Sequence, residues 1–165
     1  MEYELLLEKM VKLLSKTNYV VLATASKDGI VTASKMCVIA EGTTLYFQTD
    51  FNFEKARNIM ENPNVAITIE NIYFKGQATI IGHPSENQLF VEKMKERHYQ
   101  TYENYTNLPN QILIKVNLTE CRIWGIWQNN DIGDDSVVKE ESIKVLNLKN
   151  KQLTKIKCDN LKGGY

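Results

Sequence analysis

A single lysine stands at the start of a predicted helix, where a cation is unfavourable unless an anion is nearby. The segment LYFQTDFNFEKARNIMENPNVAI, residues 45–67, begins as an alternating strand, breaks after Thr49 and becomes a helix with Lys55 in its first turn. A helix N-terminus already has unpaired N–H groups and the positive end of the helix dipole. The pattern therefore indicates a phosphate site. The alternative is that Lys55 is a solvated surface lysine, with Glu54 as the usual first-turn acid.

Histidines and cysteines offer little further chemistry. His83 and His98 are isolated from cysteines and paired carboxylates, whereas a zinc site needs three or four clustered ligands, so we predict structural or surface roles and no metal. The three cysteines, Cys37, Cys121 and Cys158, are far apart and form no Cys-x-x-Cys pair. Cys37 lies within a predicted strand and is expected to be a small buried hydrophobe.

Length and charge limit the classes of protein to consider. A chain of 165 residues fits one domain, or one domain with a small appendage. Its 20 acids and 20 bases balance, so no overall field attracts it to nucleic acid or to an anionic membrane. No segment is long enough for a membrane span, and no signal peptide opens the chain. We therefore expect a cytoplasmic protein with reduced thiols and no nucleic-acid or membrane partner.

The elements that position Lys55 follow from hydrophobic periodicity. Residues 2–16 have apolar side chains at helical spacing, which predicts an amphipathic helix on the outside of a sheet. Strand-like runs follow at 19–26, 30–42 and 43–49, joined by the hairpin signal Asp28-Gly29 and the tight connection Glu41-Gly42. These runs predict three sequential antiparallel strands.

The remaining pattern alternates helices with strands. The helix after Asn52 should end at Asn62-Pro63, because proline disfavours helical geometry in the residue before it. Strands are predicted at 64–70 and 74–84, and a helix capped by Ser85 over 85–102. Residues 110–129 predict two last strands on either side of Thr119-Glu120.

Six or seven short strands in hairpin succession favour a mainly β fold, a small antiparallel barrel with flanking helices, over a doubly wound sheet. The barrel domain is predicted at residues 1–128. Residues 129–165 are first polar and acidic and then lysine-rich, which predicts either a C-terminal appendage or a partly disordered segment.

From Tyr19 to Pro84 the chain resembles the pyridoxamine 5′-phosphate oxidase-like flavoproteins, which fold as an FMN-binding split barrel. The resemblance rests on the hairpin VLATASKDGIVTASKM, the aromatic strand ending in Thr49, the helix-start Lys55, the terminator ENPNVAI and the strand KGQATIIGHP, and it returns weakly at residues 122–127. It implies a six- to seven-stranded antiparallel split barrel, bound FMN and a homodimer that shares its sites.

The resemblance also assigns cofactor contacts. Thr49 and Lys55 would hold the FMN phosphate, and Gln77 would approach the flavin from the neighbouring subunit, unless it is only an exposed strand residue. Trp124, with Trp127 as the runner-up, would lie against the flavin, unless it packs in the core. The implied cofactor-binding set is Ser34, Lys35, Met36, Cys37, Gln48, Thr49, Lys55, Gln77 and Trp124. Strand register decides which of residues 34–37 face the cofactor.

Two departures from the family pattern narrow the function. Glu54 stands where many relatives have a second base, which lowers the positive potential beside Lys55. Arg122-Ile123-Trp124 lacks the histidine of the late Arg-x-His motif of vitamin-B6 oxidases. The chain thus looks more like the small bacterial general stress proteins.

This resemblance implies an FMN-dependent oxidoreductase that uses a small-molecule substrate or a reduced nicotinamide donor. A non-enzymatic flavin- or haem-binding module, or use of a deazaflavin, are the alternatives.

Overall fold

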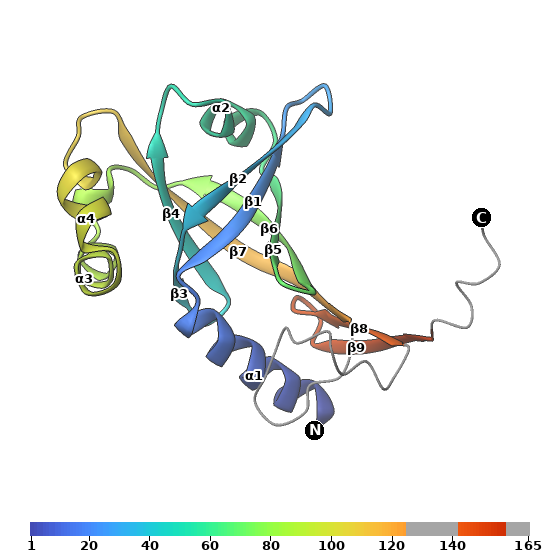
Figure 1. Cartoon of the computed structure of the whole chain (residues 1–165). Helices are drawn as coiled ribbons and strands as arrows, with labels where there is room; N and C mark the ends of the chain where they lie inside the picture. Colours follow the sequence, from blue (N-terminus) through green and yellow to red (C-terminus); the bar gives the residue numbers. More distant parts are fainter. Residues whose placement is uncertain (125–141, 158–165) are drawn as a thin grey trace.

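The computed structural model describes residues 1–124 and 142–157, and within them nine strands form one antiparallel sheet (Figure 1). The strands are β1 (Tyr19–Ala25), β2 (Val31–Cys37), β3 (Ile39–Glu41), β4 (Thr44–Asp50), β5 (Asn64–Ile69), β6 (Ile72–Ile80), β7 (Gln111–Trp124), β8 (Ser142–Asn147) and β9 (Gln152–Lys157). Seven of them are ordered β2-β1-β5-β6-β7-β4-β3, β8 pairs with β7, and β9 pairs with β8.

Helices cover the sheet from several sides (Figure 1). They are α1 (Glu2–Lys16), α2 (Glu54–Glu61), α3 (Gln88–Arg97) and α4 (Tyr99–Thr101), with short turns η1 (Pro84–Glu86) and η2 (Tyr102–Thr106). Leu6, Met10 and Leu14 form the buried face of α1 and join the main core with the inward residues of the strands. The prediction of a mainly antiparallel split barrel with flanking helices is confirmed.

A second, smaller core lies under α3. Phe90 and Met94 pack there against Tyr46 and Leu113 from β4 and β7, so both faces of these strands are covered. The predicted helix cap at Ser85 is wrong. The Asn87 side chain accepts the hydrogen bond from the Phe90 amide at 2.9 Å, and Ser85 lies in the preceding turn η1.

Two predicted strand boundaries differ from the structure. The predicted run 30–42 is divided into β2 and β3 at Val38, whose amide donates to the Asn18 carbonyl at 3.1 Å. The predicted break at Thr119-Glu120 is also wrong, because β7 continues through both residues to Trp124. Its pairing with β6 shifts there instead: Lys75 lies opposite Glu120 and Gly76 opposite Leu118, which leaves Thr119 as the extra residue of a β-bulge.

A glycine permits this bulge. A Cβ at position 76 would lie 2.6 Å from Cγ1 of Val116 and 3.0 Å from the Asn117 carbonyl oxygen, so β6 approaches β7 more closely than any side chain allows. The bulge also reverses the inward alternation of β7, from Val116 and Leu118 before it to Cys121 and Ile123 after it.

Residues 142–157, within the segment predicted to be an appendage, form a hairpin that extends the sheet. β4 pairs with residues 111–117 of β7, and β8 pairs with residues 120–124 of the same edge. Leu146 is buried in the main core. Glu2 of α1 forms ion pairs with Lys155 at 2.8 Å and Lys144 at 4.0 Å, which tie the hairpin to the N-terminal helix.

Candidate functional site

The connection between β4 and α2, residues 50–53, is a tight local turn. Asp50 Oδ1 accepts from the Asn52 backbone amide at 2.8 Å and from the Asn52 side-chain amide at 3.1 Å, while the Phe53 amide donates to the Asp50 carbonyl. Phe53 is the N-cap of α2 and its side chain accepts no capping hydrogen bond. The first N–H groups of α2 are therefore left without the side-chain acceptor that most helices have.

Thr49 and Lys55 lie on the two sides of this turn. Thr49 is the buried next-to-last residue of β4, and Lys55 is the second residue of the helix. The Lys55 Nζ is 5.0 Å from the Phe53 ring centroid, and within the described part of the chain it has no carboxylate partner. Desolvation lowers the pKa of Lys55 from its usual value. An anion at this point would restore the stability of its charged form.

A buried polar cluster holds α2 on the sheet. Asn58 Nδ2 donates to Thr24 Oγ1 at 3.1 Å and to Thr32 Oγ1 at 3.3 Å, and the two hydroxyls are 3.3 Å apart. Asn58 and Thr24 are both buried. The position of Lys55 thus depends on a contact between the helix and the first hairpin. Asn58 was not predicted from the sequence, although an amide on the apolar face of an amphipathic helix could have indicated a buried polar contact.

Strand alternation divides the predicted set at residues 34–37. Met36 is buried in the main core, and Ser34 pairs with Leu22 on the same inward side of β2. Lys35 and Cys37 point to the outer face, where Lys35 Nζ lies 4.6 Å from the Tyr19 ring centroid. The four residues are therefore not brought together at one surface.

Gln48 and Cys37 contact the helical segment after α3. Gln48 Oε1 accepts from Thr106 Oγ1 at 2.8 Å, and Cys37 Sγ is 3.9 Å from Thr101 Oγ1. Cys37 is half-buried rather than buried, which corrects the sequence prediction. In this structure both side chains link the sheet to α4 and η2.

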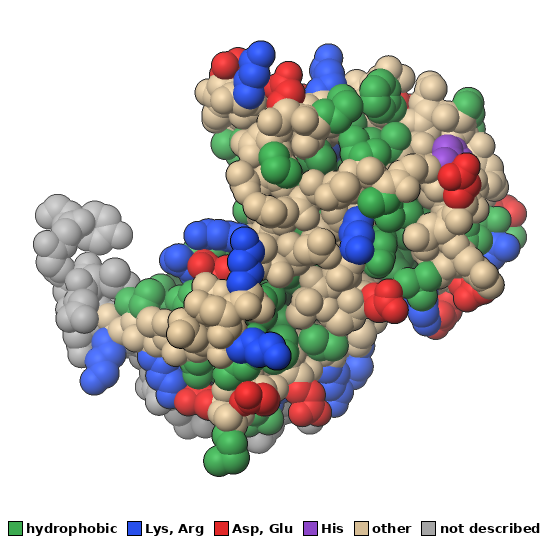
Figure 2. All heavy atoms as spheres, turned by 180° about the vertical axis from the view of Figure 1, so that it is seen from behind, with side chains coloured by type: hydrophobic (Ala, Val, Ile, Leu, Met, Phe, Trp, Pro, Cys, Tyr) green, Lys and Arg blue, Asp and Glu red, His purple; other side chains and the backbone are tan. Residues whose placement is uncertain are grey.

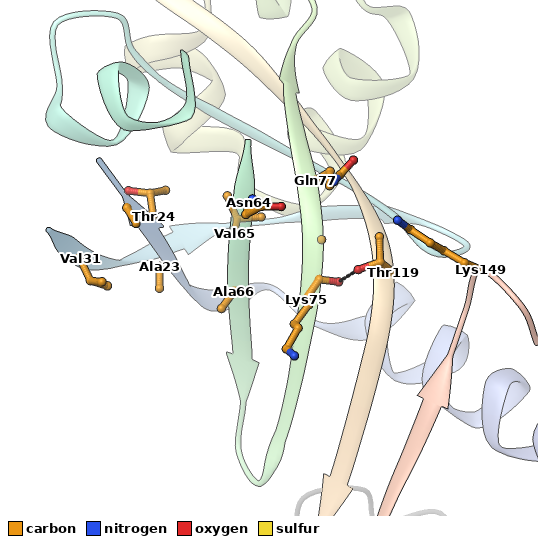
Figure 3. Close-up of a pocket in the computed structure, with 12 residues that line it drawn as sticks. Ala23, Thr24, Val31, Asn64, Val65, Ala66, Lys75, Gln77, Thr119 and Lys149 are labelled. Atoms are coloured by element: carbon orange, nitrogen blue, oxygen red, sulfur yellow. Dashed lines mark hydrogen bonds between the residues drawn. The ribbon is translucent and has the colours of Figure 1, made fainter. Parts of the chain in front are cut away.

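Gln77 lines a hollow of about 470 Å³ on the outer face of the sheet, which we call the sheet-face hollow (Figure 3). The strands β1, β2, β5, β6 and β7 supply its walls, and the turn between β8 and β9 supplies one more residue, Lys149. Gln77 is exposed and lies opposite Asn64 on β5 and Asn117 on β7. Alanine side chains, small enough to leave the space open, line the β1 and β5 side.

Trp124 borders a second hollow, of about 300 Å³, together with Tyr73, Arg122 and Ile143. Its side chain is 52% exposed, so the alternative that it packs in the core is wrong. Arg122 lies over the Tyr73 ring at 5.5 Å and donates to Glu120 at 2.7 Å. Trp127, the runner-up, is outside the described residues.

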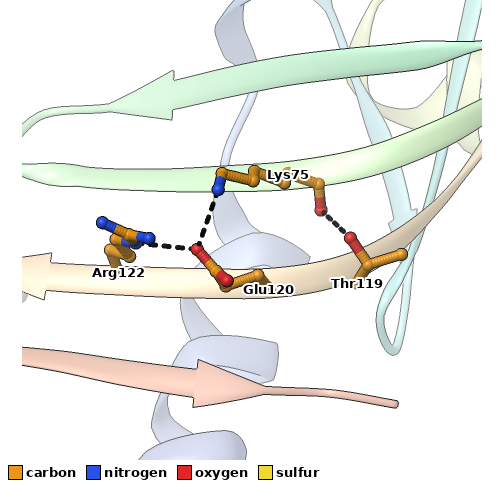
Figure 4. A network of polar contacts seen from close by, with 4 residues as sticks. All are labelled: Lys75, Thr119, Glu120 and Arg122. Atoms are coloured by element: carbon orange, nitrogen blue, oxygen red, sulfur yellow. Dashed lines mark hydrogen bonds and ion pairs between the residues drawn. The ribbon is translucent and has the colours of Figure 1, made fainter. Parts of the chain in front are cut away.

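Glu120 lies between the two hollows and forms ion pairs with Lys75 and Arg122. Lys75 Nζ lies 3.4 Å from its carboxylate, and Figure 4 shows Lys75 and Arg122 directed at it from either side. Burial raises the pKa of Glu120, but Arg122 and Lys75 together outweigh this effect and hold the pKa below its usual value. Thr119, beside it in the bulge, donates from its hydroxyl to the Lys75 carbonyl at 3.2 Å.

The two histidines have structural contacts. His83 bonds to the Ser85 hydroxyl at 2.7 Å and to the Leu108 carbonyl at 2.8 Å. His98 is buried with its ring edge to Tyr19, and burial lowers its pKa. Residues 1–124 and 142–157 contain no group of three or more His, Cys, Asp or Glu placed to bind a metal ion.

Charges on the surface are mixed. On the face shown in Figure 2, basic and acidic side chains are interspersed with apolar ones, and neither sign covers a continuous area. None of the described helices has the length and apolarity that crossing a membrane requires.

Comparison with known proteins gives a family and a fold. The family model described as pyridoxamine 5′-phosphate oxidase matches residues 6–125. General Stress Protein 26 from Bacillus anthracis str. Sterne has a similar structure, with a TM-score of 0.58 and 24% identity over 70% of this chain and 91% of that one. No curated protein matches the chain significantly.

Two further solved structures share the fold. HutZ from Vibrio cholerae, described as a haem storage protein, has a TM-score of 0.57 and 19% identity over 68% of this chain and 89% of that one. Campylobacter jejuni ChuZ has a TM-score of 0.66 and 15% identity over 94% of this chain and 62% of that one. At these identities the likeness concerns the fold alone.

Proposed function

The chain belongs to the pyridoxamine 5′-phosphate oxidase family, and on that premise we propose that it is a homodimeric FMN-binding oxidoreductase. The observation that carries the proposal is the β4–α2 connection. There a lysine without an ion-pair partner among the described residues stands in the first turn of a helix whose N-cap provides no side-chain acceptor. This combination of helix end and lysine suits a phosphate.

Thr49 and Lys55 would anchor the FMN phosphate, the threonine as a hydroxyl donor and the lysine by a charge-assisted hydrogen bond. Asn58 would act as a positioning residue, since it bonds α2 to Thr24 and Thr32. The lowered pKa of Lys55 fits this role, because a phosphate favours the charged form that desolvation disfavours.

Gln77 would meet the flavin of the neighbouring subunit, because its side chain lies on the exposed outer face of the sheet. Lys35 shares that outer face, and Trp124 is exposed further along β7. Their exposure supports a role at a surface between subunits. Ser34 and Met36 would act from the inward side of β2, as support for the strand.

When bound, FMN supplies the electron-transfer chemistry. The residues of the chain would bind the phosphate, orient the ring and exclude water from one of its faces. Hydride transfer suits such a site because it depends on positioning more than on proton transfer.

The absorption spectrum of the purified protein tests the function. We expect flavin bands that bleach when a reduced nicotinamide nucleotide is added. A Soret band with no flavin would contradict the proposal and favour a haem-binding role, as in the haem storage protein HutZ. Flavin bands that no electron donor bleaches would favour a carrier or sensor of flavin over an enzyme.

Light scattering at micromolar concentration tests the shared site. We expect the mass of a dimer. A monomer that retains FMN would contradict the role of Gln77, because an exposed glutamine on the outer face would then have no flavin to meet.

A further inference from the structure

The β8–β9 turn is attached to the bulge of β7. Because Thr119 has no Cα partner on β6, β4 or β8, its carbonyl is available, and the Leu148 amide donates to it at 2.9 Å. The side chain of Leu148 packs against the main core. The close approach of β6 and β7 at Gly76 thus determines where this turn is held.

The turn itself is closed by one side chain. Asn147 Oδ1 accepts from the backbone amides of Lys149 at 3.1 Å and Asn150 at 3.2 Å. Because the Leu148 amide is bonded to β7 and the Lys149 amide to Asn147, Lys149 is held at the edge of the sheet-face hollow. Figure 3 shows its side chain directed toward Thr119 and Gln77.

Lys149 is the uncompensated cation of the hollow. Lys75, the other lysine in the lining, is paired with Glu120. Lys149 forms no ion pair with any residue in the ranges 1–124 and 142–157, and the residues that line the hollow include no acid. The local field in the hollow is therefore positive, although the whole chain has no net charge.

The remaining walls define the shape of a ligand. Ala23, Ala25, Val31 and Ala66 form an apolar side, and Gln77 and Asn64 offer amide groups next to it. A volume of about 470 Å³ is in the range of small-molecule sites, which combine an apolar lining with a few polar groups. Such a space fits a small apolar molecule that carries one carboxylate group.

We propose that the sheet-face hollow binds a small carboxylate, with Lys149 as the residue that recognises the charged group. The proposal rests on the proposed function in one respect: if Gln77 meets the flavin of the partner subunit, the carboxylate would be a substrate held against that flavin. Lys149 would then determine specificity from outside the residues matched by the family model, which end at 125.

Benzoate and its uncharged isostere benzamide are suitable probes, titrated calorimetrically into the full-length protein with and without FMN. We expect benzoate to bind more tightly than benzamide, and Lys149→Gln to weaken benzoate binding by about two- to fivefold without affecting benzamide, as removal of an exposed ionic contact does. Lys157→Gln, a neutralised lysine of the same hairpin that does not line the hollow, is the matched control and should bind benzoate as the unchanged protein does.

Equal affinities for benzoate and benzamide, no binding of either, or equal losses in Lys149→Gln and Lys157→Gln would overturn the proposal. FMN affinity is measured in parallel on each protein. Failure to bind FMN contradicts the proposed function alone, since the titration without FMN still decides whether the hollow binds a carboxylate.

Discussion

The β4–α2 connection and the sheet-face hollow are built in opposite ways. Thr49, Asp50 and Lys55 are neighbours in sequence, and hydrogen bonds within residues 50–53 shape the turn between them. The hollow draws its lining from five strands and a distant turn, and Lys149 reaches it only because a bulge in β7 holds that turn. The proposed phosphate site is therefore local, whereas the hollow depends on the whole sheet.

This difference suggests a division of roles. A phosphate is the same in every FMN molecule, so a short segment of fixed geometry is sufficient to bind it. A substrate pocket has to discriminate, and the side chains that give it shape come from separate elements that can vary independently. Changes in the sheet should therefore alter the hollow, while the preference for a phosphate should persist.

The largest effect is expected from filling the close approach between β6 and β7. Gly76→Val places a branched side chain where even a Cβ would meet Val116 and the Asn117 carbonyl, so we expect a loss of about 3 kcal/mol in unfolding free energy. Urea denaturation measures it. Ala66→Val, at an exposed position of the neighbouring strand, should change stability by about 0.5 kcal/mol or less.

The same variant separates the two regions. If enough Gly76→Val protein folds, it should still prefer FMN to riboflavin, because the β4–α2 connection is shaped locally, and it should lose its preference for benzoate over benzamide. Loss of the FMN preference together with the benzoate preference would mean that the two regions do not differ as described.

A smaller effect is expected at the Asn58 cluster, which ties α2 to the first hairpin. Asn58→Leu keeps a similar volume but removes one buried and one partly buried hydrogen bond, so the free energy of unfolding should fall by about 1–2 kcal/mol. FMN affinity should fall more than riboflavin affinity, since the N-terminus of α2 is released. Arg57→Leu, exposed on the same helix, is the control for the helix itself. A stable Asn58→Leu protein with unchanged FMN affinity would show that the cluster does not position Lys55.

The smallest effect concerns the charge beside Lys55. Glu54 is exposed, so its repulsion of a bound phosphate is screened by solvent. Glu54→Arg should tighten FMN binding about two- to fivefold at low salt, with a smaller gain at high salt and none for riboflavin. A fluorescence titration at two ionic strengths measures this. A gain that did not depend on salt would argue against a charge effect.

The strands and helices could be predicted from the sequence because their periodicity is local. The bulge in β7 and the place of Lys149 could not. Along β7 the buried positions change phase at Thr119-Glu120, from Val116 and Leu118 to Cys121 and Ile123. A phase change fits either a turn between two strands or a bulge within one strand. Only the pairing with β6 distinguishes them, because Gly76 allows the strands to stay in contact.

The place of Lys149 in the hollow could not be predicted for a related reason. It lies in a lysine-rich segment that composition marks as a solvated appendage, and its place in the hollow depends on hydrogen bonds to Thr119 and Asn147. By contrast, the proposed phosphate site lies within seven consecutive residues, 49–55, so the helix-start lysine together with the family resemblance was sufficient to propose it from the sequence. The division of residues 34–37 between two faces required the strand register.

The most direct test of the account is a comparison of FMN and riboflavin binding in the unchanged protein and in Lys55→Ala, with Lys12→Ala on the exposed side of α1 as a control. We expect the unchanged protein to prefer FMN, and Lys55→Ala to lose about tenfold or more in FMN affinity with riboflavin unaffected, as loss of a charge-assisted hydrogen bond predicts. If Lys55→Ala bound FMN as tightly as the unchanged protein, or lost FMN and riboflavin equally, Lys55 would be a solvated surface lysine and the β4–α2 connection would not be a phosphate site.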